Sequence, residues 1–477
     1  MRKTKICIIG LGTYGSYLTK RLLEHCGTSV DITILETGDK HTQSEQEIGF
    51  KSSSQYSNAA SQGRFFGLGG TSAKWGGQIL FFDERENPSK DSIWETIITL
   101  NQKYKRQVLK QLLGDRQLKK LDQYTYEQGA FKTGLWLKYT KRNLFQRLSA
   151  TQLAQVELKK KVRVVAFKQD GEKILGVITI NQEGLEEYIA ADVFYLTAGA
   201  IESCRLLLQS MPELTQQTDL GKNFGDHISI ELLRIYGQQP KIVGMSIVPR
   251  IINGSLATRR LIVQTQTGRI GFLHPIYNKD VQVFTLLKSI LFGKQKSKVS
   301  IKDLLHGMLF LFLFGSKYLF FNKLHIHKNN WSLQLDLEQS FPNTNQLSLS
   351  GELDIYNQRG VSLNWNISDE DRACVAEIKD QVINMLKQQG TNYHDIASEN
   401  DLGHKIEDVY HPVGFIRMGT DERAVANMNY QIEGTNNLFH FSTALLPSAK
   451  AINPTAAAFC FIEDHLDRSY SFLNKAI

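Results

Sequence analysis

The order of apolar and polar residues predicts a strand, a loop, a helix and a second strand at the start of the chain. Residues 6–9 form a continuous apolar run, which is typical of a strand buried on both faces. Apolar residues then recur at helical spacing between positions 17 and 23. A second apolar run, residues 32–35, ends at Glu36. This pattern predicts a βαβ-type unit with parallel strands.

The pattern changes several times after this unit. A long stretch, residues 91–155, reads as helical and strongly basic, and its Lys and Arg clusters indicate a solvated helix face. Two alternating runs, at 162–167 and 175–180, flank Asp170-Gly171 and predict a hairpin. An apolar strand at 193–197 then leads into a helix from Ile201, so the chain returns to the first sheet.

The C-terminal half predicts a second sheet. Residues 228–280 and 331–366 alternate between apolar and polar positions, which indicates one antiparallel sheet interrupted by an insertion. Residues 367–390 read as an amphipathic helix, and residues 403–477 return to the core. The length of 477 residues fits two interleaved domains.

The loop after the first strand carries a dinucleotide-binding pattern. Gly10 permits a tight turn, Gly12 lets the backbone approach a pyrophosphate, and Gly15 lets the helix pack closely on the strand. The helix N-terminus offers free N–H groups to phosphates. Glu36 lies 21 residues after Gly15, where a carboxylate accepts hydrogen bonds from a ribose diol. Its charge disfavours a 2′-phosphate, so FAD or NAD is expected rather than NADP.

A second glycine-rich stretch occupies residues 61–78. Such a run forms no regular element, and it suits a loop whose backbone N–H groups crowd against a flat or anionic ligand. The alternative is a flexible surface loop, but Phe65, Phe66 and Trp75 argue against free solvation.

The insertion, residues 284–328, is rich in Lys and contains the apolar run 308–314. Its continuous apolar part is shorter than the roughly 20 residues that a membrane-spanning helix needs. Three interpretations remain open. It forms a buried helical hairpin over the substrate site, a basic amphipathic element at a membrane surface or on a lipid-linked substrate, or an oligomer interface.

Composition limits the function further. The apolar fraction of 42% and the charged fraction of 22% are those of a soluble globular protein. A net charge of +8 without any nucleic-acid module makes a nucleic-acid partner improbable. Five widely spaced cysteines form no CxxC pair, and Cys7 and Cys460 are expected to be buried thiols. The fold begins by residue 5, so we expect no cleaved signal peptide and a cytoplasmic location.

These motifs together resemble the glucose–methanol–choline (GMC) oxidoreductases, which are FAD-dependent alcohol and sugar oxidases and dehydrogenases. The resemblance covers most of the chain in the order of the family. It includes Ala198-Gly199-Ala200, Gly221-Lys222-Asn223-Phe224 with Asp226-His227, Glu338 before Pro342 and Asn345, and Gly434 with Asn437. The cofactor-binding residues that the resemblance and the glycine loops imply are Gly10, Gly12, Thr13, Tyr14, Gly15, Glu36, Gly69, Gly70, Thr71, Ser72, Trp75, Gly76, Val164, Ala198, Gly199, Ser442, Thr443, Asn453, Pro454 and Thr455. No metal site is predicted.

The family resemblance places the chemistry on His411 and Asn453. His411-Pro412-Val413-Gly414 is similar to the segment that bears the catalytic histidine, and Ile452-Asn453-Pro454-Thr455 is similar to the segment that bears its partner. Alcohol oxidation removes a hydroxyl proton and a hydride. Histidine, with an ordinary pKa of about 6.5, accepts the proton near neutral pH. An Asn amide hydrogen-bonds the substrate oxygen without competing for that proton.

Three positions depart from the family pattern. Lys74 stands where pyranose-oxidase-like members attach FAD through a histidine, so a dissociable FAD is expected. Phe415 replaces a usual Thr, and Ser442 replaces a usual Asp, which weakens the expected contacts to the pyrimidine end of the flavin. The loop at 69–77 still resembles the pyranose-oxidase and glycoside-3-dehydrogenase branch, which favours a sugar or glycoside as the substrate.

The predicted fold class is α/β, with a Rossmann-like FAD-binding domain and an interleaved α+β substrate domain on an antiparallel sheet. The first domain comprises residues 1–90, 156–227 and 404–477, and the second comprises 91–155 and 228–403. The predicted reaction is hydride transfer from a CH–OH group to flavin N5. The alternatives are a non-sugar alcohol dehydrogenase, a nicotinamide-dependent enzyme, or a membrane-docked flavin-binding partner without turnover. The electron acceptor is left open. No heme-attachment CxxCH is present, so a heme partner would be another chain.

Overall fold

The computed structural model describes most of the chain. The described residues are 2–39, 42–54, 63–115, 118, 130–236, 241–242, 245–246, 249–252, 255–277, 309, 312–313, 315–316, 320, 331–340, 344–397 and 405–473. The insertion predicted at 284–328 therefore lies outside the described residues, apart from six positions between 309 and 320.

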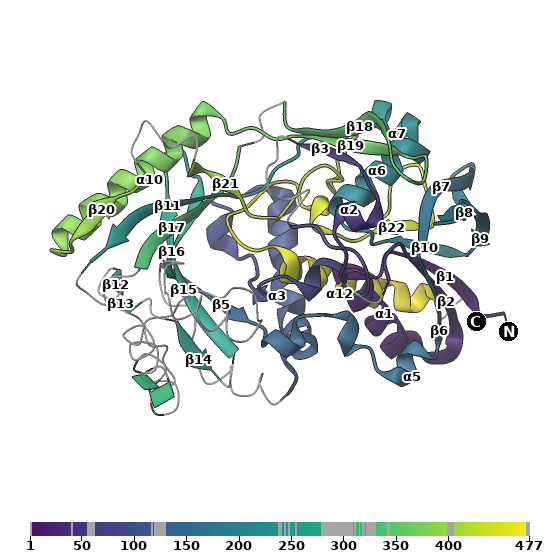
Figure 1. Cartoon of the computed structure of the whole chain (residues 1–477), viewed down its shortest axis with the longest axis horizontal. Coiled ribbons are helices and arrows are strands. Elements are labelled where there is room, and N and C mark those ends of the chain that lie inside the picture. The colour runs from purple at the N-terminus through teal and green to yellow at the C-terminus, as the bar shows by residue number, and fades with distance from the viewer. Residues whose placement is uncertain are drawn as a thin grey trace, which may run out of the picture.

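A parallel sheet of five strands forms one end of the molecule (Figure 1). Its order is β22-β10-β1-β2-β6, and every neighbouring pair is parallel. The strands are β1 Thr4–Ile9, β2 Val30–Glu36, β6 Val156–Lys160, β10 Val193–Leu196 and β22 Leu438–His440. In β1, residues 6–9 are at most 3% exposed, so the continuous apolar run does mark a strand buried on both faces.

Helices come from both halves of the sequence. They are α1 Thr13–Cys26, α2 Glu45–Ile48, α3 Ser92–Leu113, α5 Ala150–Leu153, α6 Ala200–Ser210, α7 Pro212–Gln217 and α12 Thr455–Leu473. Helix α1 among them packs on β1 of this sheet. Helix α12 lies against both α1 and α3 in the middle of the molecule (Figure 1). The Phe459 ring stacks on Tyr17, and the buried Glu463 accepts hydrogen bonds from Tyr17 and from Arg21 of α1. The C-terminal segment is thus part of the core of the first sheet.

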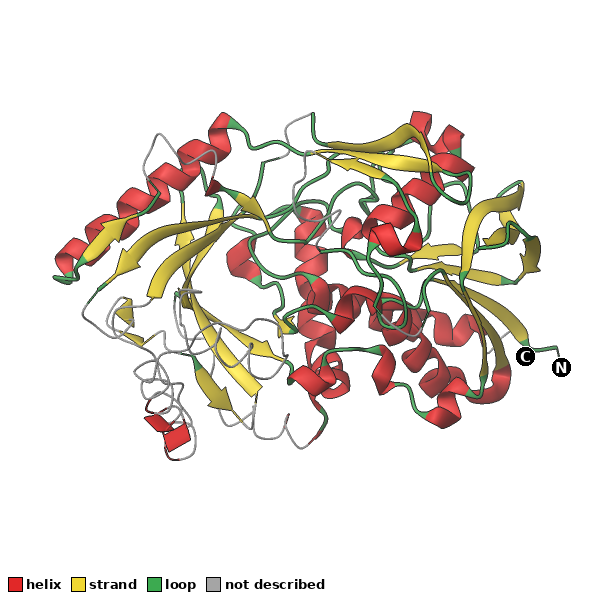
Figure 2. Cartoon of the chain, viewed as in Figure 1, coloured by secondary structure: helices red, strands yellow, loops and turns green. Residues whose placement is uncertain are grey.

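An antiparallel sheet forms the other end of the molecule (Figure 2). Its order is β20-β11-β17-β16-β15-β5-β4, with β14 beside β15 and β21 beside β11. The strands are β4 Gln78–Ile79, β5 Phe131–Trp136, β11 Ile228–Ile235, β14 Arg250–Ile252, β15 Ser255–Gln264, β16 Ile270–Tyr277, β17 Trp331–Leu337, β20 Tyr393–Asp395 and β21 Glu407–Asp408. Helix α10, Asp369–Gln388, begins at a Ser368 capping box and is the amphipathic helix that the sequence predicts.

The helical expectation for residues 91–155 is wrong in part. Helix α3 is present, but β5 follows it and pairs with β15 and β4. The sequence FKTGLW is too short to show its period of two within a basic, helix-rich stretch, and its pairing partners are distant in the sequence.

Smaller sheets and turns complete the described chain. The hairpin predicted after residue 156 is the first part of a three-stranded meander, and a further sheet joins β18 and β19 to β3. The bounds are β3 Ser52–Ser54, β7 Val162–Asp170, β8 Lys173–Asn181, β9 Glu186–Ala190, β12 Lys241–Ile242, β13 Met245–Ser246, β18 Gln346–Leu353 and β19 Arg359–Asn364. The 3₁₀ turns are η1 Gly27–Ser29, η2 Gly70–Ala73, η3 Glu84–Glu86, η4 Tyr139–Lys141, η5 Phe145–Arg147 and η7 Thr443–Leu445.

Two strands cross the predicted division of the chain. Strands β3 and β4 come from residues 1–90, yet they pair with β19 and β5 from the segments expected in the other domain. The domain boundaries themselves stay a prediction. Within the described parts of the chain, no helix has both the length and the apolar character needed to cross a membrane.

Candidate active site

The first glycine loop is held in the close-packed form that dinucleotide binding requires. Gly10 has φ of 94°, and a Cβ there would lie 2.7 Å from Ala198 Cα. At Gly15, a Cβ would lie 2.0 Å from the carbonyl oxygen of Gly10. Around Gly12, by contrast, the nearest atom to a Cβ is 4.0 Å away, on Gly70. Helix α1 has no side-chain cap, so the N–H groups of its first turn face this open space.

Glu36 links three segments of the glycine-rich region. Its Oε2 accepts the N–H of Leu11 at 2.7 Å, and its Oε1 accepts the N–H of Gly38 at 2.8 Å and that of Gly67 at 3.2 Å. Burial raises the pKa of this carboxyl group, and the backbone N–H groups oppose the rise. A carboxylate has about four acceptor positions. Glu36 therefore organises the loops, and it also lines the cavity.

The second glycine stretch packs directly on the first. The N–H of Gly69 donates to Leu11 O at 2.9 Å, and η2 begins at Gly70. Ser72 is buried, and its hydroxyl donates to Gly69 O and accepts from the N–H of Leu144. The indole N–H of Trp75 donates to Arg142 O. This loop is thus ordered by its neighbours, which contradicts the alternative of a freely solvated loop.

One cavity of about 540 Å³ connects the glycine loops to the predicted catalytic residues. Fifteen of the predicted site residues and His411 line it. They are Gly10, Gly12, Thr13, Tyr14, Glu36, Gly70, Thr71, Trp75, Gly76, Val164, Ala198, Gly199, Thr443, Asn453 and Thr455. The cavity is not lined by the other predicted cofactor residues, which are Gly15, Gly69, Ser72, Ser442 and Pro454. Ser442, for example, hydrogen-bonds His440 and caps η7.

The residues of this cavity fit FAD. The close approach at Gly10, the open space at Gly12 and the uncapped helix suit a pyrophosphate, and Glu36 suits a ribose. Farther along, the cavity is lined by Trp75, Trp136 and glycine backbone, which suits a flat ring system. Lys74 also lines the cavity and is exposed.

His411 and Asn453 meet where the cavity adjoins the antiparallel sheet. The Nδ2 of Asn453 lies 3.1 Å from the Nε2 of His411. An amide NH₂ only donates, so Nε2 is the acceptor and the neutral ring carries its proton on Nδ1. This places the lone pair of Nε2 and the amide donor side by side, where a substrate hydroxyl contacts both.

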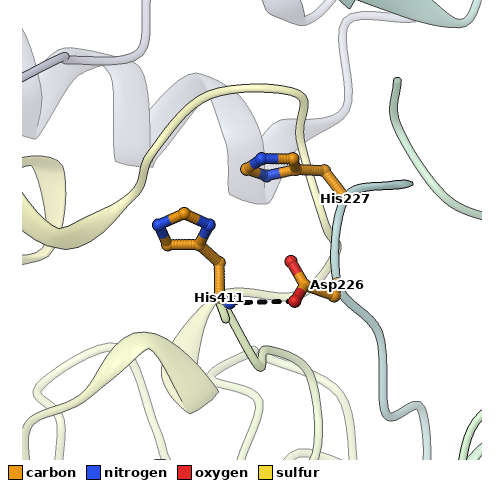
Figure 3. A group of neighbouring side chains, drawn as sticks. All are labelled: Asp226, His227 and His411. Atoms are coloured by element: carbon orange, nitrogen blue, oxygen red, sulfur yellow. Dashed lines mark hydrogen bonds between the residues drawn. The ribbon is translucent and has the colours of Figure 1, made fainter. Parts of the chain in front are cut away.

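Two neighbours hold the histidine in this orientation. The backbone N–H of His411 donates to Asp226 Oδ2 at 2.9 Å, as Figure 3 shows. The ring of His227 stacks on that of His411, with centroids 4.8 Å apart and an interplanar angle of 20°. Asp226 and His227 form the Asp-His dipeptide of the family resemblance, but sequence analysis assigned them no role at the site.

These three side chains are close enough to be considered as metal ligands, but their geometry opposes that. Their ligand atoms lie within 4.8 Å of one another. A metal ion bound by imidazole lies in the plane of the ring, along the nitrogen lone pair. Two rings stacked at 20° have no shared plane for one ion, and Asp226 already accepts N–H groups of Val409 and His411. The arrangement suits a stacked pair of neutral rings.

The electrostatic environment keeps both rings neutral near pH 7. Burial lowers the pKa of His411 well below its ordinary value, and His227 lowers it further. Burial likewise lowers the pKa of His227 to about 4, while the charge of Asp336 opposes this effect. A neutral His411 keeps Nε2 unprotonated. Its lone pair, which accepts the amide N–H of Asn453 in this structure, can take a proton, and this is the state that a general base requires.

The antiparallel sheet contributes a buried charged cluster that sequence reasoning missed. Arg260 of β15 donates to Asp336 of β17 at 2.6 Å and to Asn453 Oδ1 at 3.3 Å, and His274 of β16 lies 3.0 Å from the same carboxylate. Burial raises the pKa of Asp336, but His274 and Arg260 outweigh it and lower the pKa overall. The available signal was weak. It consisted of a charged residue on the polar face of each strand, where Asp336 shares its face with Ser332 and Gln334.

A second cluster missed from the sequence lies near Val164. Arg64, Arg163 and Glu202 line the cavity, and Glu202 accepts hydrogen bonds from both arginines. Burial raises the pKa of Glu202, but Arg163 and Arg205 lower it to about 2 overall, so this carboxylate stays ionised.

Comparison with known proteins gives a family match for the C-terminal part of the chain. Residues 342–461 match the family model described as GMC oxidoreductase. The chain has the C-terminal domain of a GMC oxidoreductase. His411 and Asn453 both lie within the matched segment. The resemblance drawn from the motifs is therefore confirmed, and with it the assignment as an oxidoreductase of a family that binds FAD.

Solved structures share the fold over almost the whole chain. Pyridoxine 4-oxidase from Mesorbium loti is similar with a TM-score of 0.58 and 14% identity, over 98% of this chain and 99% of that one. Formate oxidase is similar with a TM-score of 0.59 and 13% identity, over 99% of this chain and all of that one. An arginine variant of formate oxidase from Aspergillus oryzae RIB40, made to test FAD modification, gives a TM-score of 0.59, 13% identity and coverage of 99% of each chain. The predicted fold class is confirmed. The sequence matches no curated protein.

Proposed function

We propose that this GMC oxidoreductase oxidises a CH–OH group of a sugar, glycoside or sugar conjugate, with non-covalently bound FAD as the cofactor. The observation that carries the proposal is the pairing of His411 Nε2 with Asn453 Nδ2 at 3.1 Å on the wall of the cavity. When bound in this cavity, FAD would supply the hydride acceptor. His411 accepts the hydroxyl proton at Nε2, and Asn453 holds the substrate oxygen through Nδ2.

The sugar class rests on the sequence of the flavin loop and on the lining of the cavity. Trp136 and Gln78 belong to adjacent strands, and both line the cavity. An indole face packs on the apolar face of a pyranose, and amide groups hydrogen-bond its hydroxyls. A non-sugar alcohol is the second candidate, because the fold neighbour pyridoxine 4-oxidase is named for pyridoxine, which is an aromatic alcohol.

The test is an anaerobic visible spectrum before and after the addition of candidate alcohols. The panel contains free sugars, glycosides, nucleotide sugars and pyridoxine. Bleaching of the flavin bands by a sugar or glycoside is the expected result, and bleaching by pyridoxine alone would move the substrate to the second candidate. If the protein binds FAD but none of these compounds reduces it, the fold assignment stands and the search moves to lipid-linked or polymeric alcohols.

Replacement of His411 tests the proposed base. His411→Ala removes the proton acceptor, so flavin reduction is expected to slow by about 10²-fold or more. Stopped-flow absorbance of the FAD-loaded variant measures this directly. The matched control is His394→Ala, an exposed histidine of β20, which leaves the rate as in the wild type. An unchanged rate in His411→Ala would remove this residue from the role.

Non-covalent attachment of FAD follows from Lys74. A lysine stands where histidyl attachment would occur, and it is exposed at the cavity. Denaturation in acid followed by filtration should therefore release all the flavin into the filtrate. Flavin that stays with the protein would contradict the proposal.

Residues 284–328 provide a peripheral membrane contact in this proposal, at the inner face of a cytoplasmic membrane. Leu309, Phe312 and Phe320 are among the few described residues there, and they are 56%, 71% and 78% exposed. The segment also carries eight lysines and a single acidic residue. The full chain should float with anionic liposomes, and a variant without 284–328 should stay at the bottom of the gradient. Equal flotation of the two would reject the contact.

A further inference from the structure

We propose that Arg260 is a positioning residue, which fixes the amide of Asn453 so that its NH₂ group faces His411 and the substrate oxygen. This inference rests on the roles proposed above for His411 and Asn453. It concerns a residue of the antiparallel sheet, far from both in the sequence.

The direction of the hydrogen bonds carries the argument. A guanidinium only donates, so Asn453 presents its carbonyl oxygen to Arg260 Nη2 at 3.3 Å. The NH₂ group of the same amide must then point the other way, toward His411 Nε2. If the amide rotated by 180°, it would place its NH₂ group against the guanidinium, donor against donor. Arg260 thus permits one orientation of Asn453.

The guanidinium is itself held rigidly. Arg260 is 5% exposed, and its Nη1 donates to Asp336 Oδ2 at 2.6 Å. Its Nη2 also donates to Gln78 Oε1 at 2.7 Å. The other oxygen of Asp336 accepts from the Ser229 hydroxyl at 2.5 Å. Strands β4, β11, β15 and β17 all contribute to this arrangement, so the sheet determines the position of the guanidinium.

The same contact changes the donor strength of the amide. A positive charge on the carbonyl side of Asn453 polarises the amide, and hydrogen bonds in such a chain strengthen one another. The Nδ2–H group is then a stronger hydrogen-bond donor. It stabilises the negative charge that develops on the substrate oxygen when the hydroxyl proton moves to His411. The arrangement therefore orients the substrate and favours the state in which the proton has left.

A purely structural ion pair is the competing explanation, and charge substitutions separate the two. The charged and titratable groups around His411 are His227, Asp226, Arg260 and Asp336. The neutral amide of Asn453 is its hydrogen-bond partner. Arg260→Gln removes the donor fork and one positive charge. Arg260→Gln combined with Asp336→Asn removes both charges, so the net charge near His411 returns to that of the wild type. It does not return the guanidinium N–H donor to the carbonyl oxygen of Asn453.

The first measurement is the rate of flavin reduction as a function of pH in the FAD-loaded proteins. Arg260→Gln should lower the plateau rate by about 10²-fold and shift the pH profile upward, because the charge of Asp336 then acts alone on His411. The double variant should restore the profile but keep the low plateau. Recovery of the plateau in the double variant would overturn the positioning role. If Arg260→Gln does not fold, Arg260→Lys keeps the charge and should show the low plateau with an unshifted profile.

A second measurement does not depend on turnover. In ¹⁵N-labelled protein, the side-chain NH₂ signal of Asn453, assigned by its loss in Asn453→Asp, should shift and exchange faster in Arg260→Gln. The matched control is Arg269→Gln, which breaks an ion pair of 2.7 Å between the β15–β16 loop and Asp371 of α10 and should leave the signal unchanged. An Asn453 signal that is unaltered in Arg260→Gln would overturn the inference, even where no alcohol reduces the flavin and the proposed function itself has failed.

Discussion

At the scale of single residues, Glu36 shows how one side chain serves both the fold and a ligand. The sequence predicts a ribose acceptor at this position. The structure adds three backbone N–H groups on the same carboxylate, from Leu11, Gly38 and Gly67. Because these groups come from three separate segments, Glu36 sets the distance between the two glycine loops.

Glu36→Gln is therefore expected to weaken FAD binding and to destabilise the protein without FAD. The amide replaces one acceptor oxygen by a donor, which then faces a backbone N–H in a buried site. A charge-assisted hydrogen bond contributes about 1.5–3 kcal/mol, so the Kd for FAD should rise by about 10- to 100-fold. Fluorescence titration of the protein with FAD measures this.

The control is Asp31→Asn on the same strand, where the side chain is 57% exposed and pairs with Lys3 at the surface. This variant should keep the wild-type Kd. An unchanged Kd in Glu36→Gln would mean that the carboxylate has no part in holding the cofactor region.

Residue-level chemistry was predictable where it lies in one short stretch of sequence. Gly10, Gly12 and Gly15 are separated by a few positions, and His411 precedes a recognisable Pro-Val-Gly. Arg260 and Asp336 were not predictable, because they are 76 residues apart and meet only through the register of β15, β16 and β17. A single sequence contains no signal for that register.

At the scale of elements, two glycines of one loop serve different purposes. A Cβ at Gly15 would collide with the carbonyl oxygen of Gly10, so this glycine allows α1 to pack on β1. A Cβ at Gly12 would meet nothing closer than 4.0 Å, so this glycine leaves room for a ligand rather than for the fold.

The two alanine variants should therefore separate folding from binding. Gly12→Ala is expected to keep the melting temperature of the FAD-free protein while losing FAD affinity, because the methyl group projects into the space where a pyrophosphate would approach. Gly15→Ala is expected to lower the melting temperature of the FAD-free protein, because its methyl group would clash with the carbonyl oxygen of Gly10. Such overpacking typically lowers the free energy of unfolding by about 1–3 kcal/mol. Differential scanning fluorimetry with and without FAD makes the comparison. Equal melting temperatures of the two FAD-free variants would contradict it.

Elements were predictable when a strong pattern ran through them without interruption. Strands β1 and β2 and helix α10 follow directly from their apolar periodicity. Strand β5 was missed, because six residues between basic segments carry too little pattern and its identity depends on β4 and β15 as partners.

At the scale of the whole molecule, buried histidines make the fold sensitive to acid. Burial lowers the pKa of His440 to about 4 and that of His465 to about 3, and these residues sit in β22 and α12 beside the parallel sheet. Below pH 6.5 the unfolded chain binds protons on these residues, whereas the folded chain does not until the pH approaches the lowered values. The free energy of unfolding therefore falls as the pH drops from 6.5 to 4.

This loss should be smaller in a variant that lacks one of the histidines. Each unit of difference between the folded and unfolded pKa corresponds to about 1.4 kcal/mol. His440→Asn removes the titrating group and should flatten the fall in stability between pH 6.5 and 4.5, measured by urea unfolding. The exposed His394→Asn serves as the control and should keep the wild-type slope. A slope in His440→Asn equal to that of the wild type would contradict the assignment.

The overall architecture was predictable because family motifs lie along most of the chain in order. The return of residues 193–197 and of the C-terminal segment to the first sheet is seen in the pairing of β10 with β1 and of β22 with β10. The packing of α12 on α3 was not predictable, since it depends on contacts between residues as far apart as Asn101 and Ala457, which are 356 positions apart.

The cavity that joins the glycine loops to His411 has a consequence for synthesis of the protein on the ribosome. Its phosphate-binding end is encoded by residues 9–37, but its wall is completed only by residues 409–412, 443, 453 and 455. A nascent chain therefore exposes the glycine loops for most of translation before it can enclose a flavin. Because a bound ligand stabilises only the completed fold, a cofactor of this cavity would bind after nearly all of the chain has been synthesised.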